Sequence, residues 1–170
     1  MIPPTLHTER LALRPIVEAD FSAFEQIMTS ERAKYMGGPF DRWAAWGMLC
    51  HDIAGWTLFG HGGLMLDRLT DGVCMGQVSI NGGPLFPERE LGWMLYNGFE
   101  GQGYATEAAA AMRDWAFAEL RLDSLVSYCH PANRRSIAVA ERLGAVRDEL
   151  APREDPEDLV FRHLPPRLRG

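Results

Sequence analysis

The stretch EGQGYATE, residues 100–107, separates an apolar run, LGWMLY at 91–96, from an alanine-rich run, AAAAMRDWAFAEL at 108–120. The first run has the length and character of a buried strand. The second run predicts a helix with one apolar stripe, which comprises Ala105, Ala109, Met112, Ala116 and Leu120. Two glycines, Gly101 and Gly103, therefore stand where a strand turns into a helix.

These glycines favour a site for an anion. Glycine has no side chain, so a ligand can come within contact distance of the main chain. The first-turn amides of the following helix lack intrahelical partners, and the helix dipole is positive at that end. Gly103 to Thr106 are therefore candidates for holding a phosphate, with a mere tight turn as the alternative.

Two well-known phosphate loops fit the stretch less well. A P-loop needs Gly-Lys followed by Ser or Thr, and here Tyr104 follows Gly103. The dinucleotide-binding fingerprint needs Gly or Ala where Thr106 stands, and it usually follows the first strand of its domain.

Length, composition and charge limit the classes of protein to which this chain can belong. A chain of 170 residues with 46% hydrophobic content can bury a core without help, and we expect one domain over residues 1–170. The 17 basic and 23 acidic residues give a net charge of -6, which argues against a nucleic-acid partner. The three cysteines, Cys50, Cys74 and Cys129, fit reduced thiols in a cytoplasmic protein. No apolar run approaches membrane-spanning length, so we expect no membrane partner.

The remaining patterns predict an α/β fold. We expect strands at 8–16, 63–69, 73–80, 90–96, 124–130 and 160–164, and helices at 17–28, from residue 104 to about 120, and at 134–143. Thr70, Asp71 and Gly72 join two of the strands as a hairpin. In the stretch HPANRRSIAVAERLGA, residues 130–145, Asn133 is placed to cap the second of the late helices near Ser136. The two late helices should start at the same edge of the sheet.

Two of these motifs together resemble a known family. GWMLYNGFEGQGYATEA, residues 92–108, followed by NRRSIAVAERLGA, residues 133–145, resembles the acetyl-CoA-binding core of the GNAT superfamily of N-acetyltransferases, most closely its RimJ/RimL-like branch. TERLALRPIVEADF at 8–21 and VFRHLP at 160–165 resemble the same branch.

The resemblance implies the fold and the cofactor site. The fold would be a mixed, mostly antiparallel central sheet with two splayed parallel strands, flanked by helices. The pantetheine arm of acetyl-CoA would pair with the strand carrying Trp93, Met94 and Leu95, and Asn133 would touch its end. Main-chain amides of Gly101, Gln102, Gly103, Tyr104, Ala105 and Thr106 would hold the pyrophosphate. Glu100 stands where the family motif has Arg or Gln.

Acetyl transfer to an amine requires three further groups. The amine must lose a proton, because a lysine-like amine has a pKa of about 10.4. Glu90 is the candidate base or water anchor, with Glu88 as the alternative and an ion pair of Glu90 with Arg89 as the structural reading. A main-chain amide near Met94 would stabilise the oxyanion.

The leaving thiolate needs only a weak acid, since thiols ionise near pH 8.5. Many superfamily members use a tyrosine seven residues beyond the motif asparagine, but that position is Ala140 here. Ser136 is the candidate acid or cofactor contact, against plain hydrogen bonding at the helix start, with Tyr128 and Tyr104 in reserve.

The acceptor is the least determined part. The resemblance implies a primary amine, as a protein N-terminus or a small molecule, and a monomer or homodimer. The segment 35–40, with Trp43 and Trp46, would form the acceptor wall, although the tryptophans could equally be core. The acidic segment 147–158 could attract a cationic amine or be a solvated loop. Since His51, His61 and His130 lack metal-ligand spacing, we expect no metal. A catalytically silent acyl-CoA-binding domain is the alternative function.

Overall fold

The computed structural model describes residues 1–168, which form an α/β domain around one eight-stranded sheet. The strands are β1 (Leu6–His7), β2 (Leu11–Pro15), β3 (Gly63–Arg68), β4 (Cys74–Asn81), β5 (Glu90–Leu95), β6 (Leu125–Cys129), β7 (Val146–Arg147) and β8 (Leu159–His163). The helices are α1 (Phe21–Met28), α2 (Arg42–Leu58), α3 (Tyr104–Glu119) and α4 (Arg134–Arg142), with short 3-10 turns η1 (Glu18–Asp20), η2 (Glu31–Met36) and η3 (Pro166–Leu168).

The sheet is antiparallel except at its centre. Its order is β1-β2-β3-β4-β5-β6-β8-β7, and β5 and β6 are the parallel pair. The expected hairpin joins β3 to β4, where the amide of Gly72 donates to the carbonyl of Arg68 at 2.7 Å. The expected fold class, a mostly antiparallel sheet with a parallel pair flanked by helices, is confirmed.

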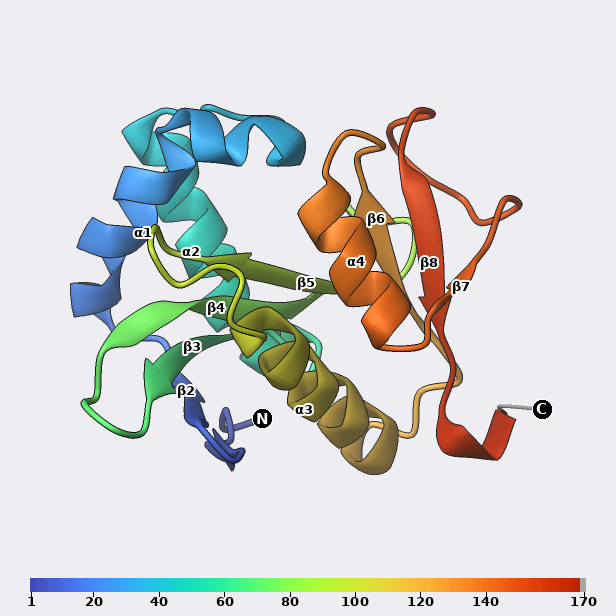
Figure 1. Ribbon diagram of the computed structural model, residues 1–170, viewed down its shortest axis with the longest axis horizontal. Helices are drawn as coiled ribbons and strands as arrows, with labels where there is room; N and C mark the ends of the chain where they lie inside the picture. The colour runs from blue at the N-terminus through green and yellow to red at the C-terminus, as the bar shows by residue number, and fades with distance from the viewer. Residues whose placement is uncertain (169–170) are drawn as a thin grey trace.

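The parallel pair separates soon after it forms. Among the described residues the register of β5 and β6 has one pair, Glu90 with Val126, and the amide of Val126 donates to the carbonyl of Arg89 at 3.0 Å. One residue further on, the hydroxyl of Ser127 donates to the carbonyl of Leu91 at 2.6 Å. Figure 1 shows the β6 ribbon turning away from β5 beyond this point, which leaves the rest of both strand edges apart.

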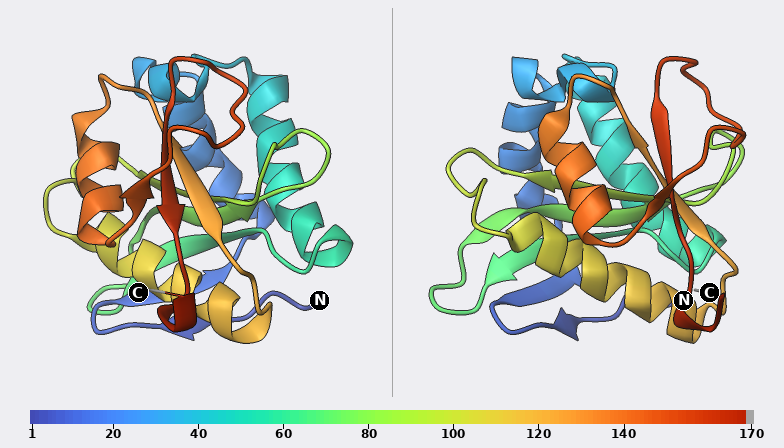
Figure 2. Two further views of the ribbon diagram at one scale, coloured as in Figure 1. Left: turned by 90° about the vertical axis from the view of Figure 1, so that its right-hand side faces the viewer. Right: turned by 45° about the vertical axis from the view of Figure 1, so that its right-hand side comes forward.

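Helices cover both faces of the sheet. The predicted stripe of α3 lies on one face, where Ala109, Met112 and Ala116 are fully buried against strand residues such as Val78. Small alanine side chains let the helix approach the sheet closely. On the other face α1 and α2 pack together through Phe24 and other residues, with Met94 of β5 against them. Figure 2 shows α2 and α4 on opposite sides of β6.

Two early segments differ from the sequence-based expectations. The helix expected at 17–28 is broken into η1 and α1, because Asp20 turns back to accept from the amide of Val17 at 2.8 Å and pairs with Arg14. Residues 42–58, for which no element was predicted, form the 17-residue helix α2, capped by Asp41. None of the helices within the described chain combines the length and apolarity that a membrane crossing needs.

Candidate functional site

A large cleft opens where β5 and β6 separate. Its volume is about 2290 Å³, and its walls come from η2, α2, β4, β5, β6, α4, the start of α3 and the loop before β8. Both turns that follow the parallel strands face this cleft, so the two sequence motifs meet in one space. Among the described residues the cleft brings together these predicted site residues: Glu90, Trp93, Met94, Leu95, Gly101, Gly103, Ala105, Thr106, Asn133 and Ser136.

The start of α3 is built to present free amides. Gly101 and Gly103 have φ values of 75° and 82°, in the left-handed region that favours glycine, and Gly103 is the N-cap residue. In the part of the chain that is described, no side chain caps this helix, whereas Asp41 caps α2 and Asn133 caps α4. The first-turn amides of α3 are therefore available to an anion.

Arg10 holds this turn from the outside. Its Nη1 donates to the carbonyl of Gln102 at 2.9 Å, and its Nε donates to Glu107 at 2.7 Å. Its guanidinium also lies 4.4 Å from the centre of the Tyr104 ring. The side chain of Tyr104 is buried in the core and does not line the cleft, which argues against the reserve role as an acid. Gln102 does not line the cleft either, so of the six residues predicted to hold the pyrophosphate only Gly101, Gly103, Ala105 and Thr106 do.

The side chains of neighbouring β5 residues lie on opposite sides of the cleft. Trp93 packs toward β6 and α4, against the cluster that includes Cys129 and Ile137. Met94 lies on the opposite side, with Phe24 and Met28. Because successive strand side chains alternate between faces, the exposed edge of β5 runs through the middle of the cleft with packed side chains on both sides.

The start of α4 supplies Asn133 and Ser136. The Asn133 Oδ1 accepts from the Ser136 amide at 3.3 Å, which is the capping arrangement expected from the sequence. Both residues also line the cleft, so the capping role of Asn133 does not exclude the predicted role of either residue in the site. Ala140 is fully buried against Cys129 and Phe161, which places the position of the family's tyrosine in the core.

Glu90 lies at the point where the parallel strands part. Its Oε2 accepts from the Asn81 Nδ2 at 3.0 Å. Burial raises the pKa of the Glu90 carboxyl, and the nearby charge of Asp158 adds to the rise. A carboxylate with a raised pKa is a stronger base than an exposed one, which suits proton abstraction.

The alternative base, Glu88, is engaged elsewhere. Its two oxygens accept from the guanidinium of Arg162 at 2.8 Å each, and it does not line the cleft. The expected partner of Glu90, Arg89, instead has its Nε 3.3 Å from Nε2 of the buried His61. The geometry therefore favours Glu90 over Glu88.

Asp52 is a buried carboxylate in the cleft that sequence reasoning missed. It projects from α2, is 9% exposed, and accepts a hydrogen bond from Gln77. Burial raises its pKa to about 7, and the charge of Glu90 adds to the rise. The available signal was an aspartate amid apolar residues in AAWGMLCHDIAGW at 44–56, a helix the sequence analysis did not identify. Buried groups with strongly perturbed pKa values gather at functional sites.

The acceptor side of the cleft differs from the prediction in its aromatic residues. Tyr35, Met36 and Gly37 line it as expected. Trp43 is 83% exposed and Trp46 packs edge-on against Phe21 with ring centres 5.0 Å apart, and neither lines the cleft, so the prediction for both tryptophans was wrong. A helix turns its residues through about 100° each, and these two fall on the outer side of α2. The wall is formed instead by Phe24, Met28, Met48, His51 and Phe86.

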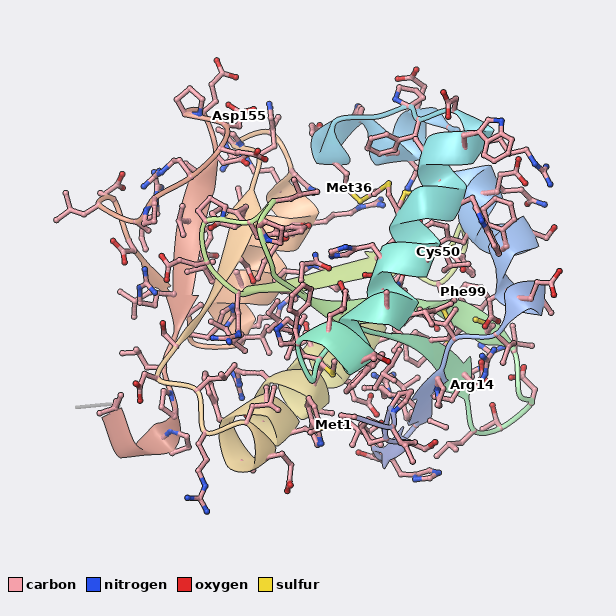
Figure 3. All side chains as sticks on the ribbon, turned by 180° about the vertical axis from the view of Figure 1, so that it is seen from behind. Met1, Arg14, Met36, Cys50, Phe99 and Asp155 are labelled. Carbon is pink, nitrogen blue, oxygen red and sulfur yellow. The ribbon has the colours of Figure 1, made fainter. Side chains whose placement is uncertain are left out.

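The acidic loop between β7 and β8 reaches the cleft. Glu154, Asp155 and Asp158 line it. Arg153 braces the loop from within, because its Nη1 donates to the carbonyl of Asp158 and its Nη2 to that of Glu149, both at 2.8 Å. Figure 3 shows Asp155 and Met36 toward the same end of the molecule, and both residues line the cleft.

The described residues also bear on metal and thiol chemistry. Among them there is no group of three His, Cys, Asp or Glu side chains placed to hold a metal ion. The three cysteines are free. Burial raises the pKa of Cys129 to about 12, so this thiol stays protonated.

The comparisons identify the family. Residues 10–146 match the sequence model of the Acetyltransferase (GNAT) domain. The chain belongs to the GNAT acetyltransferase family, as the sequence motifs indicated, and membership implies acyl transfer from acetyl-CoA.

Individual relatives agree with this family. The crystal structure of the acetyltransferase from Agrobacterium tumefaciens str. C58 is 59% identical, with a TM-score of 0.93, and the match covers 96% of this chain and 95% of that chain. The structure titled "RimL- Ribosomal L7/L12 alpha-N-protein acetyltransferase in complex with Coenzyme A" shares the fold, with a TM-score of 0.69, 19% identity, and coverage of 92% and 95%.

Curated relatives match over shorter stretches. The "Putative ribosomal N-acetyltransferase YdaF" of Bacillus subtilis is 32% identical over 108 residues, which is 60% of this chain and 59% of that protein. The stretches shared with two other Bacillus subtilis proteins span 35% and 32% of their lengths.

Proposed function

We propose that this protein transfers the acetyl group of acetyl-CoA to a primary amine by direct attack in a ternary complex. The observation that carries the proposal is the cleft, which joins the uncapped start of α3 to the half-buried carboxylate of Glu90. Acetyl-CoA would lie with its diphosphate on the main chain of Gly101 to Thr106. Its pantetheine arm would follow the free edge of β5 past Trp93, Met94 and Leu95 to Asn133.

Glu90 is the proposed base. An attacking amine must be unprotonated, and the raised pKa of Glu90 brings its basicity closer to that of the amine. The carboxylate would take the proton directly or through one water. Asn81 fixes the carboxylate orientation, because its amide donates to one of the two oxygens.

The remaining steps need an oxyanion donor and a weak acid. An amide of β5 near Met94 is the proposed oxyanion donor, since the strand edge facing β6 is no longer paired there. Ser136 is the proposed acid for the departing thiolate, or a contact to the cofactor sulfur. Tyr128 is less suited, because its hydroxyl donates to the carbonyl of Pro152 at 3.3 Å and burial raises its pKa to about 12.

The acceptor is proposed to be cationic. Five carboxylates line its end of the cleft: Asp52, Glu90, Glu154, Asp155 and Asp158. The acidic loop residues Glu154 and Asp155 add negative charge to this lining, which favours a primary ammonium group near the entrance and disfavours acidic acceptors. A protein N-terminus of the kind suggested by the RimJ/RimL-like branch fits, and so does a small polyamine or amine antibiotic. The three free cysteines make the reducing cytoplasm the expected compartment.

The test is release of free CoA from acetyl-CoA with a panel of amines: peptides beginning with Ser, Ala or Met, free amino acids, polyamines and aminoglycosides. We expect turnover with one class, and Glu90→Gln should lower it about 100-fold to 10,000-fold while acetyl-CoA affinity is kept. Turnover that survives Glu90→Gln would refute the base assignment.

One observation keeps a second function in view. The position of the family's usual acid, Ala140, is a buried alanine, so a binding domain without catalysis is the alternative. Acetyl-CoA would then raise the melting temperature although no amine in the panel released CoA. Preference for ATP or NAD over CoA in the same measurement would exclude both functions.

A further inference from the structure

Glu100 stands where the family motif has Arg or Gln, at the start of the loop 100–103 that precedes α3, called here the phosphate loop. Its carboxylate already has hydrogen-bond and ion-pair partners within the protein. Its Oε2 accepts from the amide of Gly98 at 2.8 Å, and its Oε1 pairs with the Nη1 of Arg32. The Nη1 of Arg135 lies 4.0 Å from the same oxygen. Burial alone would raise the pKa of Glu100, but the amides of Glu100 and Gly98 and the charges of Arg32 and Arg135 outweigh it and lower the pKa.

Arg32 reaches this loop from the opposite wall of the cleft. It belongs to η2, 68 residues earlier in the chain than Glu100. Besides Glu100, its guanidinium contacts the side chain of Asn97 and donates from Nη2 to the carbonyl of Leu95 at 2.9 Å. One planar group therefore joins the end of β5, the turn after it and the phosphate loop, a geometry that a lysine could not reproduce.

The local charge is positive despite the glutamate. Arg32, Arg135 and Glu100 all line the cleft, and two guanidinium groups around one carboxylate leave one net positive charge. Gly101 and Gly103 follow directly in the chain. Arg32 of η2 thus stands in for the basic residue that the family motif has at position 100, and Glu100 holds Arg32 in place.

We propose that Arg32 provides the cationic contact for the diphosphate of acetyl-CoA and that Glu100 is a positioning residue that keeps Arg32 there. This inference rests on the proposed function, which places the diphosphate on the same loop. The inference also predicts an effect of Glu100 on CoA affinity opposite to the one that charge repulsion alone predicts. A glutamate beside a diphosphate would weaken binding by repulsion, so its neutralisation should tighten binding. A glutamate that positions an arginine should do the opposite.

The test is a double-mutant cycle with CoA as the probe and isothermal titration as the measurement. We expect Arg32→Met to weaken CoA binding about tenfold, the scale of one charge-assisted hydrogen bond. Glu100→Gln should weaken it about threefold to tenfold, and the double variant should bind no worse than Arg32→Met alone, because Glu100 acts through Arg32. The KM for acetyl-CoA should rise in parallel, with kcat changed less than about twofold.

A matched pair on the surface provides the control. Arg42 and Glu25 form an ion pair at 2.9 Å outside the cleft, so Arg42→Met and Glu25→Gln should leave CoA affinity unchanged. The salt dependence of CoA affinity should fall in Arg32→Met, a change that loss of a purely structural contact would not produce. Affinity for 3′-dephospho-CoA should respond to the Arg32 and Glu100 changes as CoA affinity does, since the diphosphate is common to both.

The outcomes separate this inference from the proposed function. If the unmodified protein does not bind CoA, the proposed function fails. If it binds CoA but Glu100→Gln binds equally or more tightly, the positioning role is wrong while the cofactor site stands. A response limited to CoA and absent with 3′-dephospho-CoA would refute the assignment to the diphosphate.

Discussion

Replacing Asp52 by asparagine should stabilise this protein at neutral and alkaline pH. The carboxyl is buried, 9% exposed, and asparagine keeps the oxygen that accepts from Gln77. Burial raises the pKa of Asp52 from its ordinary 3.8 to about 7. The folded protein therefore holds this proton at pH values where the unfolded chain has released it, so the stability of the neutral form is complete below 3.8 and is lost as the pH rises to about 7.

The size of the effect follows from the two pKa values. At about 1.4 kcal/mol per pKa unit, the full rise corresponds to about 4 kcal/mol that wild type loses and the variant keeps above pH 7. At pH 5 only about 1.6 kcal/mol of this has been lost, so the advantage of Asp52→Asn should grow by about 3 kcal/mol between pH 5 and pH 8. Such a cost, carried by a residue in the cleft, is expected of a functional group rather than a structural one.

The assay is urea unfolding of both proteins at pH 5 and pH 8, with free energies from linear extrapolation. Asp114→Asn is the control for the same chemical exchange at a surface position, because that carboxylate is 60% exposed. We also expect Asp52→Asn to raise the KM for a cationic acceptor about tenfold. A variant less stable than wild type at pH 8, or an advantage independent of pH, would refute this account of Asp52.

Three further outcomes are expected. The acid limb of the kcat/KM profile should lie above the ordinary glutamate range, because burial and the charge of Asp158 raise the pKa of Glu90; a limb within the ordinary range would contradict Glu90 as the base. Gly101→Ala and Gly103→Ala should each lower the melting temperature by the equivalent of about 1 kcal/mol, because their φ values of 75° and 82° strain a residue with a Cβ, and both should weaken CoA binding if these glycines hold the diphosphate. Tyr96→Phe should be neutral or stabilising by up to about 1 kcal/mol in urea unfolding, because the Tyr96 hydroxyl is buried without a hydrogen-bond partner in the described structure; marked destabilisation would show that it has one.

Local patterns were sufficient for most of the strands and for the two motif helices. The stripe of α3 is read from its spacing, and the hairpin from Thr70, Asp71 and Gly72, because these elements follow short-range preferences. The helix α2 was missed, since it is apolar over much of its surface and lies where the family resemblance is weakest. Because α2 was not predicted, Asp52 was not identified as a cleft residue. The orientation of α2 was unknown too, so the prediction for Trp43 and Trp46 was wrong.

The sequence by itself determined the family, most of the strands, the two motif helices and the two turns that follow the parallel strands, because each depends on residues adjacent in the chain. Only the tertiary structure decided which side chains share the cleft. The separation of β5 from β6 depends on pairing between distant segments, and the approach of Arg32 to Glu100 depends on how η2 is placed beside the end of β5. Neither has a signature in local sequence, since contacts between residues far apart in the chain are fixed by packing. The same holds for the pKa of Asp52, which is raised chiefly by its burial where α2 packs against the sheet.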